Sequence, residues 1–313
     1  MRFALIGALA LVVGAAAAPA TADTRVTFKS AKAGSSYYQM AVQLAEAMPD
    51  DISMTVEESQ GSVQNVMEAA VRGGDYVFTT PPALPRLAAA GKAMFEERAN
   101  PKFAEIRALF PIPSLTMHFV VRADQDAQTM ADLEGKSILL GKGSFGAREG
   151  AKYLGLFGLE GKVDVADAEL SNAVAALKNG QIDAFVTAGS FPAPNVIEAA
   201  AGTGVTVISL SDEEVAATKR TRLVIPAGTY PGQNEDVVTT SLPVVAYTTT
   251  AMDDDTAYAL TKAYWDNKEA LGGTAAWWNG VTPDFLSNID GPIHPGALRY
   301  YDEQGISVPD TAR

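Results

Sequence analysis

Serine and glycine recur at four turns whose residue types suit the binding of a small anion. The turns lie at residues 34–36, 60–62, 141–147 and 189–191, and each precedes a segment that reads as a helix. A helix start offers unpaired N–H groups and roughly half a positive charge, and small residues let a carboxylate approach closely. Serine and glycine also begin helices in proteins of every kind, so capping is the better explanation of any single turn, and only the four turns together favour a binding site.

The glycine-rich turn at 141–146 does not fit a nucleotide site. It lacks the terminal Gly-Lys-Ser/Thr of a phosphate-binding loop, and glycines at 141, 143 and 146 make a poor dinucleotide fingerprint. Lys142 or Arg148 could pair with a ligand carboxylate, and either is equally suited to a solvated surface.

Groups for catalysis or metal binding are scarce in this chain. It contains no cysteine and only two histidines, His118 and His294, which lie far apart in the sequence. A hydrolase or transferase needs a nucleophile, a base and an orienting group within reach of one another. We therefore predict that the protein is not an enzyme and uses no cofactor or metal.

Several residues with chemical potential are better explained by structure. His118 lies in an apolar stretch and is expected in the core or at a hinge. Asp253, Asp254 and Asp255 begin a predicted helix, where acids complement the helix dipole. The pair at 277–278, two tryptophans on a late predicted helix, is interpreted as lobe packing or a docking surface.

The N-terminus predicts export. Arg2 precedes an uncharged apolar run over residues 3–18, and Ala20-Thr21-Ala22 fits a small-x-small cleavage pattern. The run is shorter than the roughly 20 apolar residues that span a bilayer, so we expect cleavage near Ala22 and a periplasmic protein. A formal net charge of −13 argues against nucleic acid or anionic lipid as a partner.

Strand, turn and helix patterns alternate along the chain and predict an α/β fold. Two strand-like segments, 117–122 and 242–249, bracket a block in which the same pattern restarts. We predict lobe I from 23–118 plus 244–313, and an inserted lobe II at 119–243, after a signal peptide at 1–22. The pattern also predicts Ser62 as a helix N-cap, Pro192 in the first turn of a helix, and one helix over 253–271.

Ligands of open α/β sheets bind beside helix starts at the carboxyl ends of strands. Two of the four turns fall in each predicted lobe, so closure of the lobes would bring them face to face. This arrangement predicts a ligand cleft between two lobes that are joined by a two-stranded hinge.

Several longer motifs occur in order along the chain. They are Ser35-Ser36-Tyr37-Tyr38, Gln60-Gly61-Ser62-Val63-Gln64-Asn65, Asp183-Ala184-Phe185 with Pro192-Ala193-Pro194, Ile225-Pro226-Ala227-Gly228-Thr229-Tyr230-Pro231-Gly232-Gln233, and Ile293-His294-Pro295-Gly296-Ala297-Leu298-Arg299-Tyr300-Tyr301. The chain resembles the TAXI family of solute receptors for TRAP (tripartite ATP-independent periplasmic) transporters over nearly its whole length after residue 22.

The resemblance implies a type II periplasmic-binding-protein fold with two Rossmann-like lobes. It also implies a TRAP membrane permease as partner, with uptake driven by an ion gradient, and a ligand such as glutamate, glutamine, 2-oxoglutarate or a related organic acid. The ligand-binding residues that it implies are Ser36, Tyr38, Ser62, Thr80, Gly143, Ser144, Phe145, Gly146, Ala147 and Ser190.

The chain departs from the family pattern at two turns. Thr79-Thr80-Pro81-Pro82 stands where relatives have a Gln-Ser-Asp type turn, and proline removes a donor N–H. Lys142 replaces a small residue or proline and could hold a second carboxylate. A receptor of the same fold that serves an ABC importer or a sensor kinase is the main alternative function, and a secreted hydrolase is a weaker one.

Overall fold

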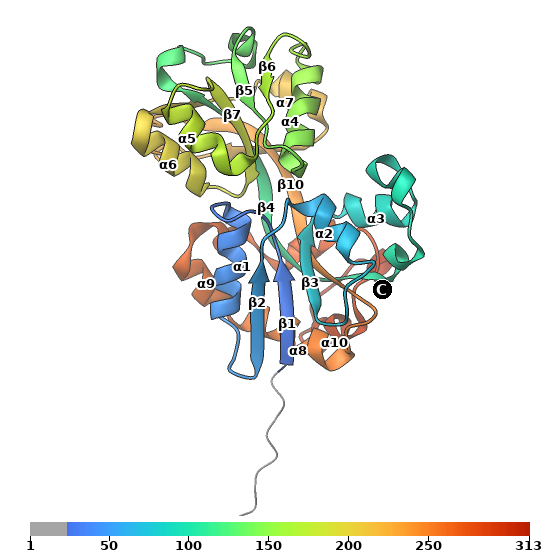
Figure 1. Cartoon of the computed structure of the whole chain (residues 1–313). Helices are drawn as coiled ribbons and strands as arrows, with labels where there is room; N and C mark the ends of the chain where they lie inside the picture. The colour runs from blue at the N-terminus through green and yellow to red at the C-terminus, as the bar shows by residue number, and fades with distance from the viewer. Residues whose placement is uncertain (1–23) are drawn as a thin grey trace, which may run out of the picture.

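The computed structural model describes residues 24–313, so the predicted signal peptide and its cleavage point near Ala22 lie outside the described residues. The chain forms two lobes, one above the other in Figure 1, and the long strands β4 (Ile106–Arg122) and β10 (Val237–Thr249) run through both. Within residues 24–313 the strands make one ten-stranded sheet in the order β2-β1-β3-β10-β4-β7-β5-β6, with β8 beside β4 and β9 beside β10.

The first lobe, the lower one in Figure 1, is built on parallel strands that each lead into a helix. Its elements are β1 (Thr24–Lys29), α1 (Ser36–Glu46), β2 (Ile52–Glu57), α2 (Ser62–Glu68), β3 (Tyr76–Thr80), α3 (Ala83–Ala89), α8 (Asp254–Asp266), α9 (Lys268–Thr274) and α10 (Pro295–Glu303). The sequence spaces Tyr37, Met40 and Leu44 as one apolar face of a helix over 37–48, and all three are buried on α1.

The second lobe repeats the same construction. Its elements are β5 (Ser137–Leu139), α4 (Phe145–Leu156), β6 (Asp164–Ala166), α5 (Ala173–Lys178), β7 (Ala184–Gly189), α6 (Pro194–Thr203), β8 (Val205–Val207), α7 (Asp212–Thr218) and β9 (Thr221–Ile225). Strand β5 lies parallel between β6 and β7. The predicted division of the lobes at residues 118 and 243 falls within the two long strands and stays a prediction.

Strands β4 and β10 pair antiparallel and connect the lobes. The ladder shifts register between Leu242 and Val244, on either side of Pro243, because proline has no N–H to donate to it. Strand β4 starts at Ile106, whereas the sequence predicted a strand only from Met117. The prediction began too late because Pro111 and Pro113 interrupt the strand pattern of the sequence before Met117.

Three helix predictions are wrong in detail. Gly61, not Ser62, is the N-cap of α2, and Ser62 is its first helical residue. Pro192 follows a cis peptide bond and precedes α6, which begins at Pro194. The single helix predicted over 253–271 is two helices that meet at Asn267.

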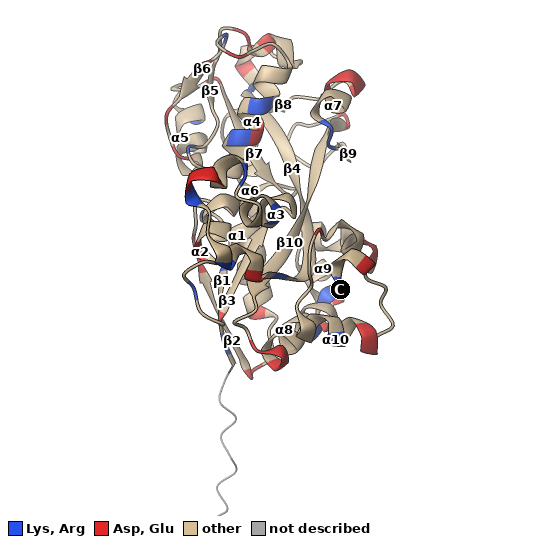
Figure 2. Cartoon of the chain, turned by 90° about the vertical axis from the view of Figure 1, so that its right-hand side faces the viewer, with Lys and Arg blue, Asp and Glu red and all other residues tan. Residues whose placement is uncertain are grey.

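Charge is distributed over both lobes, with acidic and basic residues interspersed in the view of Figure 2. No helix within residues 24–313 has the length and apolar character needed to cross a membrane. Buried apolar side chains stabilise the fold, and the largest core cluster joins residues of both lobes.

Candidate functional site

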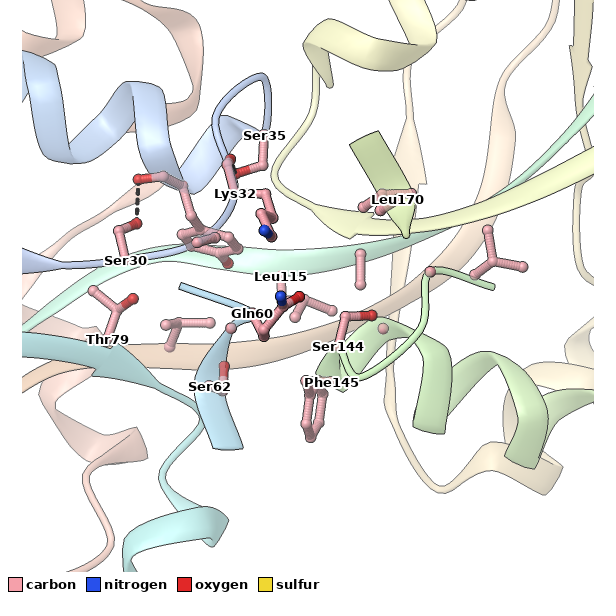
Figure 3. A pocket seen from close by; sticks show the side chains of 18 of the residues that line it. Ser30, Lys32, Ser35, Gln60, Ser62, Thr79, Leu115, Ser144, Phe145 and Leu170 are labelled. Atoms are coloured by element: carbon pink, nitrogen blue, oxygen red, sulfur yellow. Dashed lines mark hydrogen bonds between the residues drawn. The ribbon is translucent and has the colours of Figure 1, made fainter. Parts of the chain in front are cut away.

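A pocket lies between the lobes at the carboxyl ends of the parallel strands. Both lobes contribute turns to it (Figure 3), and the connecting strands contribute Leu115 and Val244 to its lining. Its lining residues are Ser30, Ala31, Lys32, Ser35, Tyr37, Gln60, Gly61, Ser62, Thr79, Leu115, Gly141, Lys142, Ser144, Phe145, Gly146, Leu170, Val186, Ala188 and Val244. The predicted position of the ligand cleft agrees with this pocket, because strand ends and helix starts meet there.

The turn between β1 and α1 supplies hydroxyl groups to the first-lobe wall. Ser35 caps α1 by accepting the N–H of Tyr38 at 3.3 Å, and its own hydroxyl donates to the carbonyl of Lys32. Ser30 Oγ donates to the carbonyl of Tyr37 at 2.6 Å. These local bonds hold the turn in one shape and leave the Lys32 side chain extending toward the pocket (Figure 3).

A buried asparagine ties two first-lobe turns together. Asn65 on α2 is fully buried, and its Nδ2 donates to the carbonyls of Ser30 at 2.7 Å and Thr79 at 3.0 Å. Both carbonyls belong to residues that line the pocket. Asn65 is therefore a positioning residue, which the sequence analysis missed because its partners are distant in the sequence.

The start of α2 depends on a glycine. Gly61 adopts φ +112°, which favours glycine, and its N–H donates to Ser59 Oγ at 2.9 Å. The preceding Gln60 N–H donates to Gln64 Oε1 at 2.7 Å, in the manner of a capping side chain. These bonds leave the Ser62 side chain on the pocket wall.

The second-lobe wall is the turn between β5 and α4. Gly141 and Gly143 have φ +84° and +78°, and this lets the chain turn sharply before Ser144. Ser144 is the N-cap of α4, and its Oγ accepts the N–H of Ala147 at 2.9 Å. Ser144 Oγ makes no other hydrogen bond among the described residues, so its proton can donate toward the pocket.

Each of the two lysines that line the pocket has an acidic partner from the second lobe. Lys32 Nζ lies 3.2 Å from a carboxylate oxygen of Glu169, and this contact crosses between the lobes. Gln60 Nε2 also donates to Glu169, at 3.3 Å. Lys142 Nζ lies 2.9 Å from Asp167. The pKa of Glu169 is held below its usual value, first by hydrogen bonding to Lys32.

The structure brings together only part of the predicted set of site residues. Four of them line the pocket: Ser62, Ser144, Phe145 and Gly146. Gly143 and Ala147 adjoin these residues in the same turn without lining it, and Arg148 is also absent from the lining.

The remaining four predicted residues, Ser36, Tyr38, Thr80 and Ser190, lie outside this lining. Ser36 is buried, and among the described residues its Oγ has no hydrogen-bond partner. Ser190 Oγ donates to the carbonyl of Ser114 at 2.7 Å, which ties β7 to β4. Lys32 and Gln60 line the pocket, but the sequence did not identify them as site residues. Their positions could have suggested a role at the site, because Lys32 lies just before the predicted turn at 34–36 and Gln60 begins the predicted turn at 60–62.

A second hollow lies on the other face of β4. Ser114 and Thr116 line it, whereas Leu115 lines the first pocket, and alternate residues of a strand point to opposite faces. The lining of the second hollow includes Trp277 and no charged residue, while Trp278 is buried in the core. Of these two hollows, the first combines charged side chains with turns of both lobes, and we take it as the site.

Both histidines have structural partners. His118 is fully buried, with Nδ1 3.1 Å from the carbonyl of Thr116 and Nε2 2.8 Å from the hydroxyl of Tyr230. His294 caps α10 and contacts the carbonyl of Met252. No cluster of three or more potential metal ligands is found among residues 24–313. Asp253 caps α8, which confirms the structural interpretation of that acidic run.

Comparison with known proteins agrees with this geometry. The model of the NMT1-like family matches residues 28–305. The chain belongs to the NMT1-like family.

Solved structures of other proteins are similar in fold to this NMT1-like chain. MatC from Rhodopseudomonas palustris, solved with bound malate, is 12% identical with a TM-score of 0.58, and the match covers 90% of this chain and 97% of MatC. The periplasmic binding protein BugD is 11% identical with a TM-score of 0.55, over 92% and 99% of the two chains. The predicted two-lobed α/β fold of periplasmic binding proteins is confirmed.

Proposed function

We propose that this NMT1-like protein is the periplasmic receptor of a TRAP-type transporter of the TAXI family. In this proposal it binds a small organic acid or amino acid between its lobes and delivers it to a membrane permease. The observation that carries the proposal is the interlobe pocket, whose lining combines serines from the turns before α1 and α4 with two lysines. The protein acts by binding and not by catalysis.

The receptor mechanism that we propose is closure of the lobes around the ligand. Ser62 from the first lobe and Ser144 from the second contact the ligand, together with Phe145 and Gly146 at the start of α4. A ligand that touches both lobes stabilises the conformation in which they meet, and the permease then recognises that conformation. Export and cleavage near Ala22 would deliver the protein to the periplasm.

Ligand binding is tested by the melting temperature of protein that lacks residues 1–22, measured across a panel of carboxylates. We expect a ligand-dependent rise in melting temperature, because a ligand that binds only the folded state stabilises it. Ser62→Ala and Ser144→Ala should each weaken binding by about tenfold to a hundredfold, since a hydrogen bond to a charged group contributes about 1.5–3 kcal/mol. Isothermal titration calorimetry measures this loss.

Ser211→Ala is the matched control for Ser144→Ala. Ser211 is the N-cap of α7 in the same lobe, accepts the N–H of Glu214 at 3.1 Å, and does not line the pocket. Both variants lose a capping bond, so both should lower the melting temperature. Only Ser144→Ala should change the dissociation constant, and equal affinities would mean that Ser144 serves as a cap alone.

The transporter class is tested by ligand uptake in cells that carry or lack this gene. A TRAP system should lose uptake when an ionophore collapses the ion gradient, even with ATP present. Uptake that survives the ionophore and fails on ATP depletion would instead assign the receptor to an ABC importer.

A further inference from the structure

The walls of the interlobe pocket are mainly apolar. Leu115 and Val244 come from the connecting strands, Val186 from β7, and Phe145 and Leu170 from the second-lobe turns. Four of these five side chains are buried, and Leu170 is half-buried. Such walls favour a ligand with a hydrocarbon body, because burial of apolar surface contributes about 25 cal/mol per Å².

The charge around the pocket leaves little room for a second carboxylate on the ligand. Lys32 and Lys142 are the charged residues of the lining, and Glu169 and Asp167 pair with them at 3.2 and 2.9 Å. A third acid, Glu58, accepts the N–H of Ala33 in the turn beside Lys32 at 3.0 Å. The positive charge of the lysines is thus balanced by acids that already lie next to the pocket.

One carboxylate can still be accommodated. The start of α4 contributes a partial positive charge, and Ser144 has a hydroxyl proton free to donate. A second carboxylate placed against Lys32 or Lys142 would share that lysine with Glu169 or Asp167, and like charges repel. Both pairs are partly or largely exposed, so solvent reduces this repulsion without removing it.

We infer that the ligand is a monocarboxylate with an aliphatic body rather than a dicarboxylate. The inference rests on the proposed function and narrows its ligand class. The carboxylate lies against the start of α4 and Ser144, and the aliphatic part lies against Leu115, Val186 and Val244.

The test compares ligands of matched length by titration calorimetry on the full protein without residues 1–22. The pairs are hexanoate with adipate, and 4-methyl-2-oxopentanoate with 2-oxoglutarate. We expect the monocarboxylate of each pair to bind at least tenfold more tightly. Equal or tighter binding of the dicarboxylates would overturn the inference and leave the proposed carboxylate receptor intact. Binding of none of the four would overturn both.

A single substitution tests the charge argument directly. Asp167→Asn frees Lys142, so the preference for hexanoate over adipate should fall by a factor of up to about five, which is the most that an exposed ion pair supports. Glu134→Gln is the control, because Glu134 forms a comparable exposed pair with Lys162 at 3.3 Å and lies outside the lining. An unchanged preference in Asp167→Asn, or an equal change in both variants, would contradict the role of Asp167.

Discussion

At the residue scale, the turn before α4 depends on the absence of a side chain at one position. Gly141 has φ +84°, and a Cβ added there would lie 2.9 Å from Cβ of Leu170. Leu170 lines the pocket on the segment that also carries Asp167 and Glu169. Gly141 therefore allows the two second-lobe segments of the site to lie against each other.

Gly141→Ala should lower the free energy of unfolding and weaken ligand binding. The left-handed backbone alone costs a residue with a Cβ about 1–2 kcal/mol, and the contact with Leu170 adds to this loss. Gly143→Ala is the control, because Gly143 has φ +78° and nothing within 4 Å of an added Cβ. Chemical denaturation measures both variants, and equal losses would mean that the contact with Leu170 is unimportant.

At the element scale, β4 organises the region around the site through its backbone carbonyls. Pro113 accepts the hydroxyl of Tyr37 from α1 at 3.0 Å, and Ser114 accepts Ser190 from the second lobe. Thr116 accepts His118 Nδ1. Both lobes are thus hydrogen-bonded to one strand. A shift of the β4 backbone would therefore move residues on both sides of the cleft.

The contacts of His118 determine its protonation. Tyr230 OH accepts the N–H of Ala193 at 2.9 Å, so its proton goes to His118 Nε2, and His118 Nδ1 donates to Thr116. A neutral imidazole satisfies both bonds. Burial lowers the pKa of His118 from 6.5 to about 4.

Stability should therefore decrease as the pH falls from about 6.5 to about 4. The unfolded chain takes up a proton at His118 over this range while the folded chain does not, so up to about 1.4 kcal/mol is lost per pH unit. His118→Asn should make this slope shallower in denaturation curves collected across that range. A slope identical to that of the unsubstituted protein would show that other groups are responsible, such as His294, whose pKa is also lowered by burial.

At the scale of the whole molecule, polar contacts cross the cleft beside the pocket. Lys32 and Gln60 of the first lobe both contact Glu169 of the second. The side chains of Lys32 and Glu169 are 30% and 44% exposed, so the pair contributes no more than about 1 kcal/mol. A contribution of that size still shifts an open–closed equilibrium severalfold.

Glu169→Lys should increase the mean separation of the lobes without ligand, because it places two cations together. Adding Lys32→Glu restores an opposite pair and should reverse the change. Since the chain has no native cysteine, one cysteine introduced into each lobe allows fluorescent labelling and energy-transfer measurement of the separation. The increase in lobe separation caused by Glu169→Lys should be smaller in high salt, because salt screens the repulsion between the two cations. An unchanged separation in the single variant would mean that the pair does not bias closure.

The two charge reversals also separate closure from ligand binding. If Lys32 serves only closure, the double variant should regain the affinity of the unsubstituted protein. If Lys32 also attracts the ligand, the double variant should close normally and bind a carboxylate more weakly.

Local features of the fold follow from the sequence. Apolar spacing indicates the buried face of α1. Asp253 is identifiable as a cap because its partners lie within one helical turn. The prolines of β4 prevent prediction of the start of that strand from the sequence. Local strand propensity does not include the neighbouring strands that stabilise it in the sheet.

The sequence by itself determined the class of the protein: alternating α/β units, a repeated lobe pattern, and turns rich in serine and glycine. Only the tertiary structure decided which turns meet, bringing Ser62 and Ser144 to one pocket and leaving Ser36 and Ser190 outside its lining. It also decided the effective charge of the site, because Lys32 and Lys142 are balanced by acids 137 and 25 residues further along the chain (169 − 32 and 167 − 142). The interaction between two charges depends on the distance between them in space, and their spacing along the chain does not specify that distance.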